Sequence, residues 1–101
     1  MDIAFDGPTL VLSGDFDVRS TWEVRNALHD QLHTYDDVVV DLSGVATVDH
    51  TALKVLAFAT RLAVRDGHHL TLRGCGPAVR RMLHISRLIR VVELEREAAT
   101  A

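Results

Sequence analysis

Short runs of apolar residues, some of them alternating with polar residues, occur at five places along the chain and predict five β-strands. Asp6-Gly7 is a strong turn signal between the first two runs, so these two strands should form a hairpin. The third run contains three consecutive valines, which is typical of a strand buried on both faces. The predicted strands are 3–5, 10–14, 38–41, 69–73 and 90–94.

Apolar residues at helical spacing predict three helices between these strands. Ser20 and Glu23 have the spacing of a capping box at the start of the first helix. Asp49 can cap the second helix, and Gly67 follows its end in the manner of a glycine C-cap. The predicted helices are 20–33, 50–65 and 77–85.

The order of elements is therefore ββαβαβαβ, in which each later strand follows a helix and should join the sheet through a parallel, right-handed crossover. This order predicts a compact α/β domain with a mixed, mainly parallel sheet of about five strands and an antiparallel edge strand. We expect one domain over residues 1–95, and a frayed C-terminal tail over residues 96–101.

Two features of the helices leave alternatives open. Trp22 lies off the apolar stripe of the first helix, so it either anchors a partner or packs over the start of that helix. The second helix is apolar around most of its circumference, including Phe58, and the extra apolar surface is covered either by a partner or by the neighbouring helix.

Composition narrows the class of protein. The chain has 101 residues, 48% of them hydrophobic, and a single cysteine, so no internal disulfide can form and a reducing compartment is the simplest setting. The N-terminal segment is acidic where a signal peptide needs basic residues, and no apolar run is long enough to span a membrane. The net charge of −3 argues against a general nucleic-acid binder. We therefore expect a cytoplasmic protein that neither inserts into a membrane nor binds nucleic acid directly.

Catalytic and cofactor motifs are missing from the sequence, which contains no GxGxxG, GxxxxGK[ST] or HExxH pattern. Cys75 precedes a helix N-terminus but has no base near it in sequence. His29 and His33 have a spacing that can hold a metal, but they lack a third ligand in sequence. We expect no enzyme activity, cofactor or metal. The strand ends also carry four aspartates, which either converge as a carboxylate cluster or, as the default, form caps and loop hydrogen bonds: Asp15, Asp17, Asp41 and Asp49.

Thr51 carries a hydroxyl at a position where an added anionic group would lie at the start of a helix. With Asp49 as the cap, Thr51 falls in the first turn of the helix, among unpaired backbone N–H groups at the positive end of the helix dipole. Such a place favours anionic groups, which makes Thr51 a candidate switch.

Four segments, in the same order and at similar spacing, resemble motifs of the STAS domain (sulphate transporter and anti-sigma factor antagonist), especially the stand-alone bacterial anti-sigma factor antagonists. LSGDFD at 12–17 is similar to the family's L-x-G-E-L-D, and VVVDLS at 38–43 to its V-x-V-D-L-S. GPAVRRML at 76–83 is similar to its P-x-V-x-R-x-L helix, and DHTAL at 49–53 to its central D-S-[S/T]-G-[L/M] motif.

The resemblance implies the SpoIIAA-like fold of STAS domains and a binding function without catalysis. It implies that the unphosphorylated protein binds a serine-kinase anti-sigma factor and thereby frees a sigma factor. Phosphorylation of the hydroxyl in the central motif, here Thr51, would end this interaction. The partner-binding residues would be Asp15, Asp17, Asp49, His50, Thr51 and Lys54.

The central motif departs from the family pattern at two positions. His50 replaces the first hydroxyl, and Ala52 replaces a glycine, so Thr51 is the only hydroxyl left and kinase access could be narrower. Either Thr51 is phosphorylated or the protein binds its partner constitutively. A second possibility is a regulatory subunit that binds the ATPase of an ABC-type lipid transporter, since small STAS proteins include such subunits.

Overall fold

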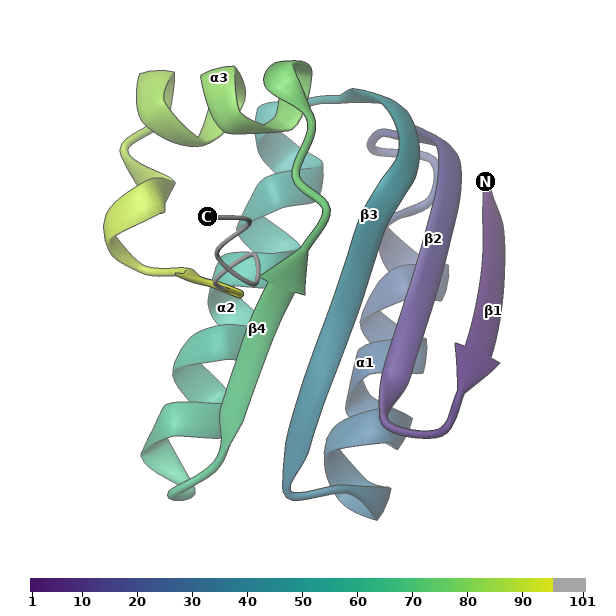
Figure 1. Ribbon diagram of the computed structural model, residues 1–101, viewed down its shortest axis with the longest axis vertical. Coiled ribbons are helices and arrows are strands. Elements are labelled where there is room, and N and C mark those ends of the chain that lie inside the picture. Colours follow the sequence, from purple (N-terminus) through teal and green to yellow (C-terminus); the bar gives the residue numbers. More distant parts are fainter. Residues whose placement is uncertain (96–101) are drawn as a thin grey trace, which may run out of the picture.

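The computed structural model describes residues 1–95, which form a five-stranded sheet and three α-helices in the predicted order (Figure 1). The predicted frayed tail, 96–101, lies outside the described residues. The elements are β1 (Asp2–Asp6), β2 (Thr9–Phe16), α1 (Thr21–Thr34), β3 (Asp37–Val48), α2 (His50–Arg65), β4 (His69–Arg73), α3 (Pro77–Ile85), the 3₁₀ helix η1 (Leu88–Arg90) and β5 (Glu93–Leu94).

The strands lie in the sheet in their order along the chain, β1-β2-β3-β4-β5. β1 is antiparallel to β2 and the other neighbours are parallel, which confirms the mixed sheet with an antiparallel edge strand. Right-handed crossovers that always advance in one direction place their helices on the same side of a sheet. Accordingly α1 and α2 both lie behind the sheet. α3 lies across the edge of the sheet at which β3 ends (Figure 1).

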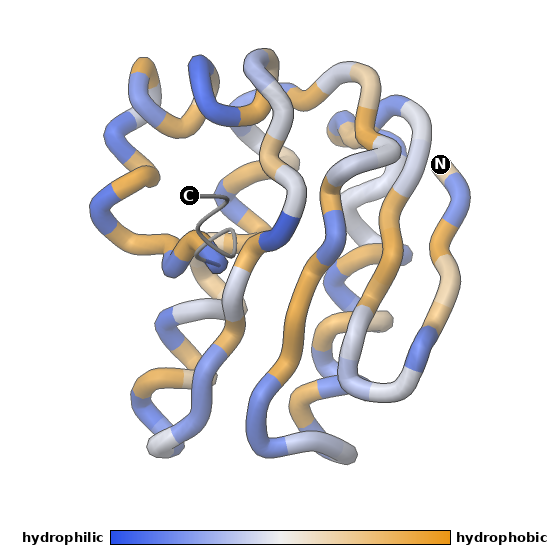
Figure 2. Tube along the Cα trace, in the orientation of Figure 1, coloured by the Kyte–Doolittle hydropathy of each residue, from blue (hydrophilic) through white to orange (hydrophobic). Residues whose placement is uncertain are grey.

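The core fills the layer between the sheet and these helices. Alternate residues of the central strands, such as Leu10, Val40 and Leu72, are no more than 1% exposed, and Leu53 and Leu56 of α2 are 0% exposed. Figure 2 shows the hydrophobic stretches along β2 and β3. The side chains of the opposite set of strand positions point to the uncovered face.

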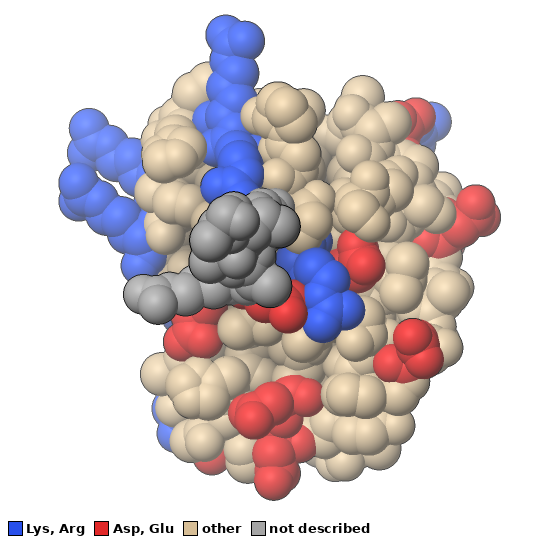
Figure 3. Space-filling model, viewed as in Figure 1, with Lys and Arg blue, Asp and Glu red and all other residues tan. Residues whose placement is uncertain are grey.

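That uncovered face of the sheet carries charged side chains of both signs (Figure 3). Arg73 pairs with Glu95 at 2.6 Å, and His69 lies 3.2 Å from Glu93. In β4 the outward positions are the polar residues His69, Thr71 and Arg73, whereas Leu70 and Leu72 are buried under the helices, so this strand has one face for the core and one for solvent.

β3 extends well beyond the predicted strand 38–41, because residues 42–48, expected as a loop, continue it to Val48. Its register against β2 shifts twice, with Leu42 and Ser43 spanning one β2 position and Ala46 inserted further on. Each β-bulge interrupts the alternation of inward and outward side chains. The prediction of a loop was wrong because the sequence pattern of a strand is lost at these bulges.

Two smaller predictions also fail. The last strand was expected at 90–94, but only Glu93–Leu94 pair with β4, because η1 includes Arg90 and the N–H groups of Val91 and Val92 turn back to the Leu88 carbonyl. The predicted capping box at Ser20 does not form. Its hydroxyl instead donates to the carbonyl of Asp17 at 3.1 Å and accepts from the Asp17 N–H at 3.2 Å, so it closes the loop before α1. Among residues 1–95, no helix is both long and apolar enough to cross a membrane.

Candidate functional site

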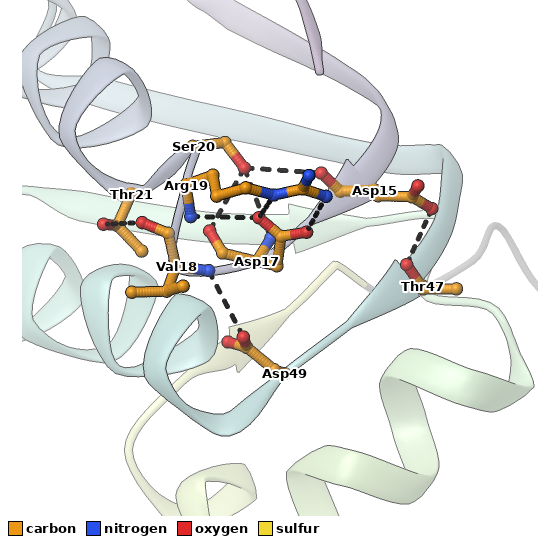
Figure 4. Close-up of polar contacts among 8 residues, drawn as sticks. All are labelled: Asp15, Asp17, Val18, Arg19, Ser20, Thr21, Thr47 and Asp49. Carbon is orange, nitrogen blue, oxygen red and sulfur yellow. Dashed lines mark hydrogen bonds and ion pairs between the residues drawn. The ribbon is translucent and has the colours of Figure 1, made fainter.

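The candidate site lies where β2 and β3 end side by side. These strands are parallel and Phe16 pairs with Val48, so the residues that follow them come together at one edge of the sheet. Figure 4 shows Asp15, Asp17 and Asp49 at this edge, which two chain segments far apart in sequence build jointly.

Asp49 links the two segments. One carboxylate oxygen accepts a hydrogen bond from the Ala52 N–H at 2.7 Å and caps α2, as predicted. The other accepts from the Val18 N–H at 3.2 Å, so the same side chain fixes the loop that leads into α1 (Figure 4). The Asp49 N–H also donates to the Phe16 carbonyl at 3.2 Å. Asp49 therefore sets the start of α2 relative to the end of β2.

Asp15 and Asp17 are held by separate partners. Asp15 accepts a hydrogen bond from the Thr47 hydroxyl at 2.7 Å. Asp17 pairs with Arg19 at 2.8 Å, and the hydrogen bonds from Arg19 hold the pKa of the Asp17 carboxyl below its usual value. Both carboxylates lie beside the start of α1, but Thr47 belongs to the end of β3 whereas Arg19 belongs to the loop before α1 (Figure 4).

Asp41 does not join this group, so the four carboxylates do not converge, and each instead accepts hydrogen bonds of the cap or loop kind that is the default expectation. It lies opposite Val11 of β2 and Arg73 of β4, whereas Asp15 lies opposite Thr47. Six residues along a strand separate Asp41 from Thr47 by roughly 20 Å. Within residues 1–95, no three His, Cys, Asp or Glu side chains are grouped so that they could hold a metal ion.

Asp41 instead stabilises the first bulge of β3. Its carboxylate accepts hydrogen bonds from the Ser43 hydroxyl at 2.6 Å and from the Ser43 N–H at 2.9 Å. The hydroxyl is the main reason that the pKa of the Asp41 carboxyl lies below its usual value.

Ser43→Ala is expected to move the pKa of Asp41 back toward the ordinary aspartate value, because the main cause of its depression is removed. A depressed folded-state pKa stabilises the fold above the unfolded-state pKa, and this stabilisation is lost as the pH falls through the folded-state pKa. The variant should therefore be less stable near neutral pH, and the difference should shrink in acid. A carboxyl-carbon NMR titration measures the shift, and an unchanged Asp41 titration would contradict it; Asp17 is the internal control.

The first turn of α2 presents His50, Thr51 and Lys54, all of them exposed. Within residues 1–95 the Thr51 hydroxyl makes no hydrogen bond, and its side chain is exposed. Ala52 is 0% exposed, so its methyl group packs into the core. The expectation that this methyl group could narrow kinase access is therefore wrong, because it does not face the surface that carries Thr51.

The structure adds apolar residues to this surface that the sequence did not indicate. Val18 is 62% exposed beside Asp49, and Ile85 of α3 is 66% exposed although its helical spacing predicts that it belongs to the apolar side of that helix. A hollow of about 440 Å³ lies between the end of β3 and α3, and its wall includes Val48, Ala78 and Ile85. The sequence did contain a signal for this apolar surface. Residues 78, 82 and 85 are apolar at helical spacing, and they form a second stripe on α3 beside the buried Val79 and Leu83.

Cys75 is buried, with 8% of its surface exposed, and burial raises the pKa of its thiol. A protonated, buried thiol is a poor nucleophile. The structure therefore gives no support to catalysis at Cys75.

Comparisons with known proteins bear on the family and the fold. Residues 1–93 match a family model described as "Mlab, STAS domain". No curated protein sequence matches the chain. The fold is similar to that of protein TM1081 of Thermotoga maritima, with a TM-score of 0.77, 17% identity, and coverage of 97% of this chain and 87% of that one.

Two further solved structures are similar at comparable coverage. An anti-sigma factor antagonist from Mycobacterium paratuberculosis has a TM-score of 0.75 at 22% identity, over 95% of this chain and 84% of that one. The Bacillus cell fate determinant SpoIIAA in its phosphorylated form has a TM-score of 0.67 at 14% identity, over 95% of this chain and 91% of that one. At these identities the likeness establishes the α/β fold shared with SpoIIAA.

Proposed function

Because the chain belongs to the STAS domain family, we propose that it is an anti-sigma factor antagonist, which binds a serine-kinase anti-sigma factor and thereby releases a sigma factor. The observation that carries this proposal is the exposed first turn of α2, fixed by Asp49, with a free hydroxyl at Thr51. Two similar structures, the one from Mycobacterium paratuberculosis and unphosphorylated SpoIIAA, are both described as anti-sigma factor antagonists, which supports the same role. In this proposal the protein acts by binding and needs no catalytic group or cofactor of its own.

The proposed contact surface combines charge and apolar area. Asp15, Asp17 and Asp49 lie at the strand ends, and His50, Thr51 and Lys54 lie on the adjoining turn of α2. The exposed side chain of Val18 and the hollow beside α3 supply the apolar part. An apolar patch surrounded by polar residues is the usual anatomy of a protein-binding surface.

Phosphorylation of Thr51 is the proposed switch. A phosphate adds about −1.5 to −2 charges, which a partner would have to desolvate next to the Asp49 carboxylate. It can also pair with Lys54, which lies three residues further on the same helix face, and so withdraw that cation from the partner. The helix N-terminus tolerates a negative charge, so the phosphate should weaken binding without unfolding α2.

Thr51→Glu is expected to weaken binding to the cognate anti-sigma kinase at least tenfold, because it places a carboxylate in the contact surface, whereas Thr51→Val should bind like the wild type. Calorimetry measures both affinities. Thr34→Glu, an exposed threonine at the far end of α1, is the matched control. Incubation with the kinase and ATP should place phosphate on Thr51, as read by mass spectrometry. Phosphate only at other residues, or unaltered binding by Thr51→Glu, would rule out the switch.

A second candidate is a subunit that binds the ATPase of an ABC-type lipid transporter. The observation that favours it is the description of the matching family model, "Mlab, STAS domain", which names Mlab in addition to the STAS domain. With His50 in place of the first hydroxyl, such a subunit could bind constitutively. Co-purification from the native cell separates the two candidates, since the first requires an anti-sigma kinase and the second a transporter ATPase.

A further inference from the structure

A groove between α1 and α2 lies outside the surface proposed for the anti-sigma kinase, apart from Lys54 at its edge. Its volume is about 600 Å³, and most of its lining is apolar. Leu28 and Ala59 form the floor and are 1% and 6% exposed, and Leu32 and Leu62 lie partly buried on the two helices. The neighbouring helices therefore cover only part of the apolar surface that the sequence places on α2.

Two aromatic side chains border this groove from opposite helices. Trp22 of α1 is 67% exposed and Phe58 of α2 is 60% exposed, although the chain contains only five aromatic residues of the Phe, Tyr and Trp types. The Arg25 guanidinium lies over the Trp22 ring, 5.6 Å from its centre. Exposed Trp and Phe side chains beside an apolar floor are typical anchors for a bound protein segment.

The charge of the groove limits what can occupy it. Arg25, His29 and Lys54 line it, and among residues 1–95 no acidic residue lines it, although the whole chain has a net charge of −3. A second copy docking through the same groove would bring like charges together, which disfavours a symmetric dimer at this face. An acidic partner is complementary to it.

The shape of the groove favours a helix over a flat surface. The lining runs over residues 22–32 of α1 and 54–62 of α2, which at 1.5 Å per residue is about 12 to 15 Å. That length matches two to three turns of a helix lying between two others. A lipid surface would touch the aromatic edges and would leave the concave floor empty.

We propose that this groove binds an acidic amphipathic helix of another protein. The apolar face of that helix packs between Trp22 and Phe58, and its carboxylates pair with Arg25 and Lys54. The proposal does not depend on the function of Thr51, because Thr51 is not among the described residues that line the groove.

A selection from a library of short helices with randomised surfaces tests the proposal on the full chain. We expect enriched helices to carry apolar residues at i, i+3 or i+4 and i+7, together with a net negative charge. Trp22 is the only tryptophan, so its fluorescence reports occupation of the groove directly. Binding of an enriched helix should shift Trp22 emission to shorter wavelength.

Variants with matched controls decide the outcome. Phe58→Ser and Arg25→Glu should each weaken binding of an enriched acidic helix at least tenfold, whereas Phe5→Ser, a phenylalanine of similar exposure on β1, should change it less than twofold. Failure to enrich any helix, enrichment without an acidic bias, or binding that survives Phe58→Ser would overturn the proposal. A Trp22 shift caused by anionic phosphatidylserine vesicles, and by no helix, would assign the groove to a membrane surface and would also overturn it.

Discussion

Gly74→Ala is expected to lower the free energy of unfolding by about 3 kcal/mol, because two costs add at this position. The backbone of Gly74 has φ of +68°, in the left-handed region that residues with a Cβ rarely adopt. A Cβ there would lie 2.8 Å from the Ser43 Cβ and 3.1 Å from the Ser43 nitrogen, so β3 or the segment after β4 would have to shift. Urea unfolding of the variant and the wild type measures the difference.

Gly67 and Gly7 separate the two costs. Both have positive φ, at +80° and +56°, but a Cβ on either would meet no atom within 4 Å. Alanine at these positions should therefore cost only the backbone strain, about 1 kcal/mol. If Gly74→Ala is no more destabilising than Gly67→Ala, the close approach to Ser43 has no energetic weight.

Asp49→Ala is expected to cost about 2 kcal/mol, because it removes the cap of α2 and the hydrogen bond to Val18 together. The loss of stability should be largest near Asp49, in addition to the decrease for the whole domain. Hydrogen exchange at the Val18 and Ala52 amides should accelerate more than exchange in the centre of β3. Urea unfolding together with exchange measured by NMR tests both parts.

Two other substitutions serve as comparisons for Asp49→Ala. Asp49→Asn keeps one acceptor oxygen and is a good cap, so it should lose only part of the stability that alanine loses. Asp15→Ala removes an exposed carboxylate that bonds the Thr47 hydroxyl, and it should change stability by less than about 0.5 kcal/mol. Equal losses for Asp49→Ala and Asp15→Ala would mean that Asp49 does not join the two segments.

Local signals in the sequence were sufficient where a short stretch determines its own conformation. The cap at Asp49, the turn after Asp6 and the C-cap at Gly67 are confirmed, since each depends on neighbouring residues and on elementary backbone preferences. The order of helices and strands followed from the same periodicity, and with the crossover rule it gave the mixed sheet. The STAS resemblance is confirmed by the family model over residues 1–93.

Features that depend on contacts between distant segments were not predictable. The bulges of β3 exist only relative to β2, so residues 42–48 carry no strand pattern of their own. The hydroxyl of Ser20 closes a loop instead of a capping box, because Asp17 lies within its reach. Exposure of Val18, Phe58 and Ile85 depends on which helix faces the neighbouring elements leave uncovered. The candidate site residues were found by motif, whereas the apolar surface beside them required the assembled fold.

Sequential strand order shortens the loops that folding must close. Every strand pairs with the strand that precedes it, so contacts between elements join segments that are near each other in the chain. The entropy cost of such closures is small, and a chain leaving the ribosome can complete the β1–β2 hairpin and then add each following unit in turn. The carboxylate hydrogen bonds of Asp49 join it to Val18 and Ala52, so this junction can form before residues 66–95 have left the ribosome.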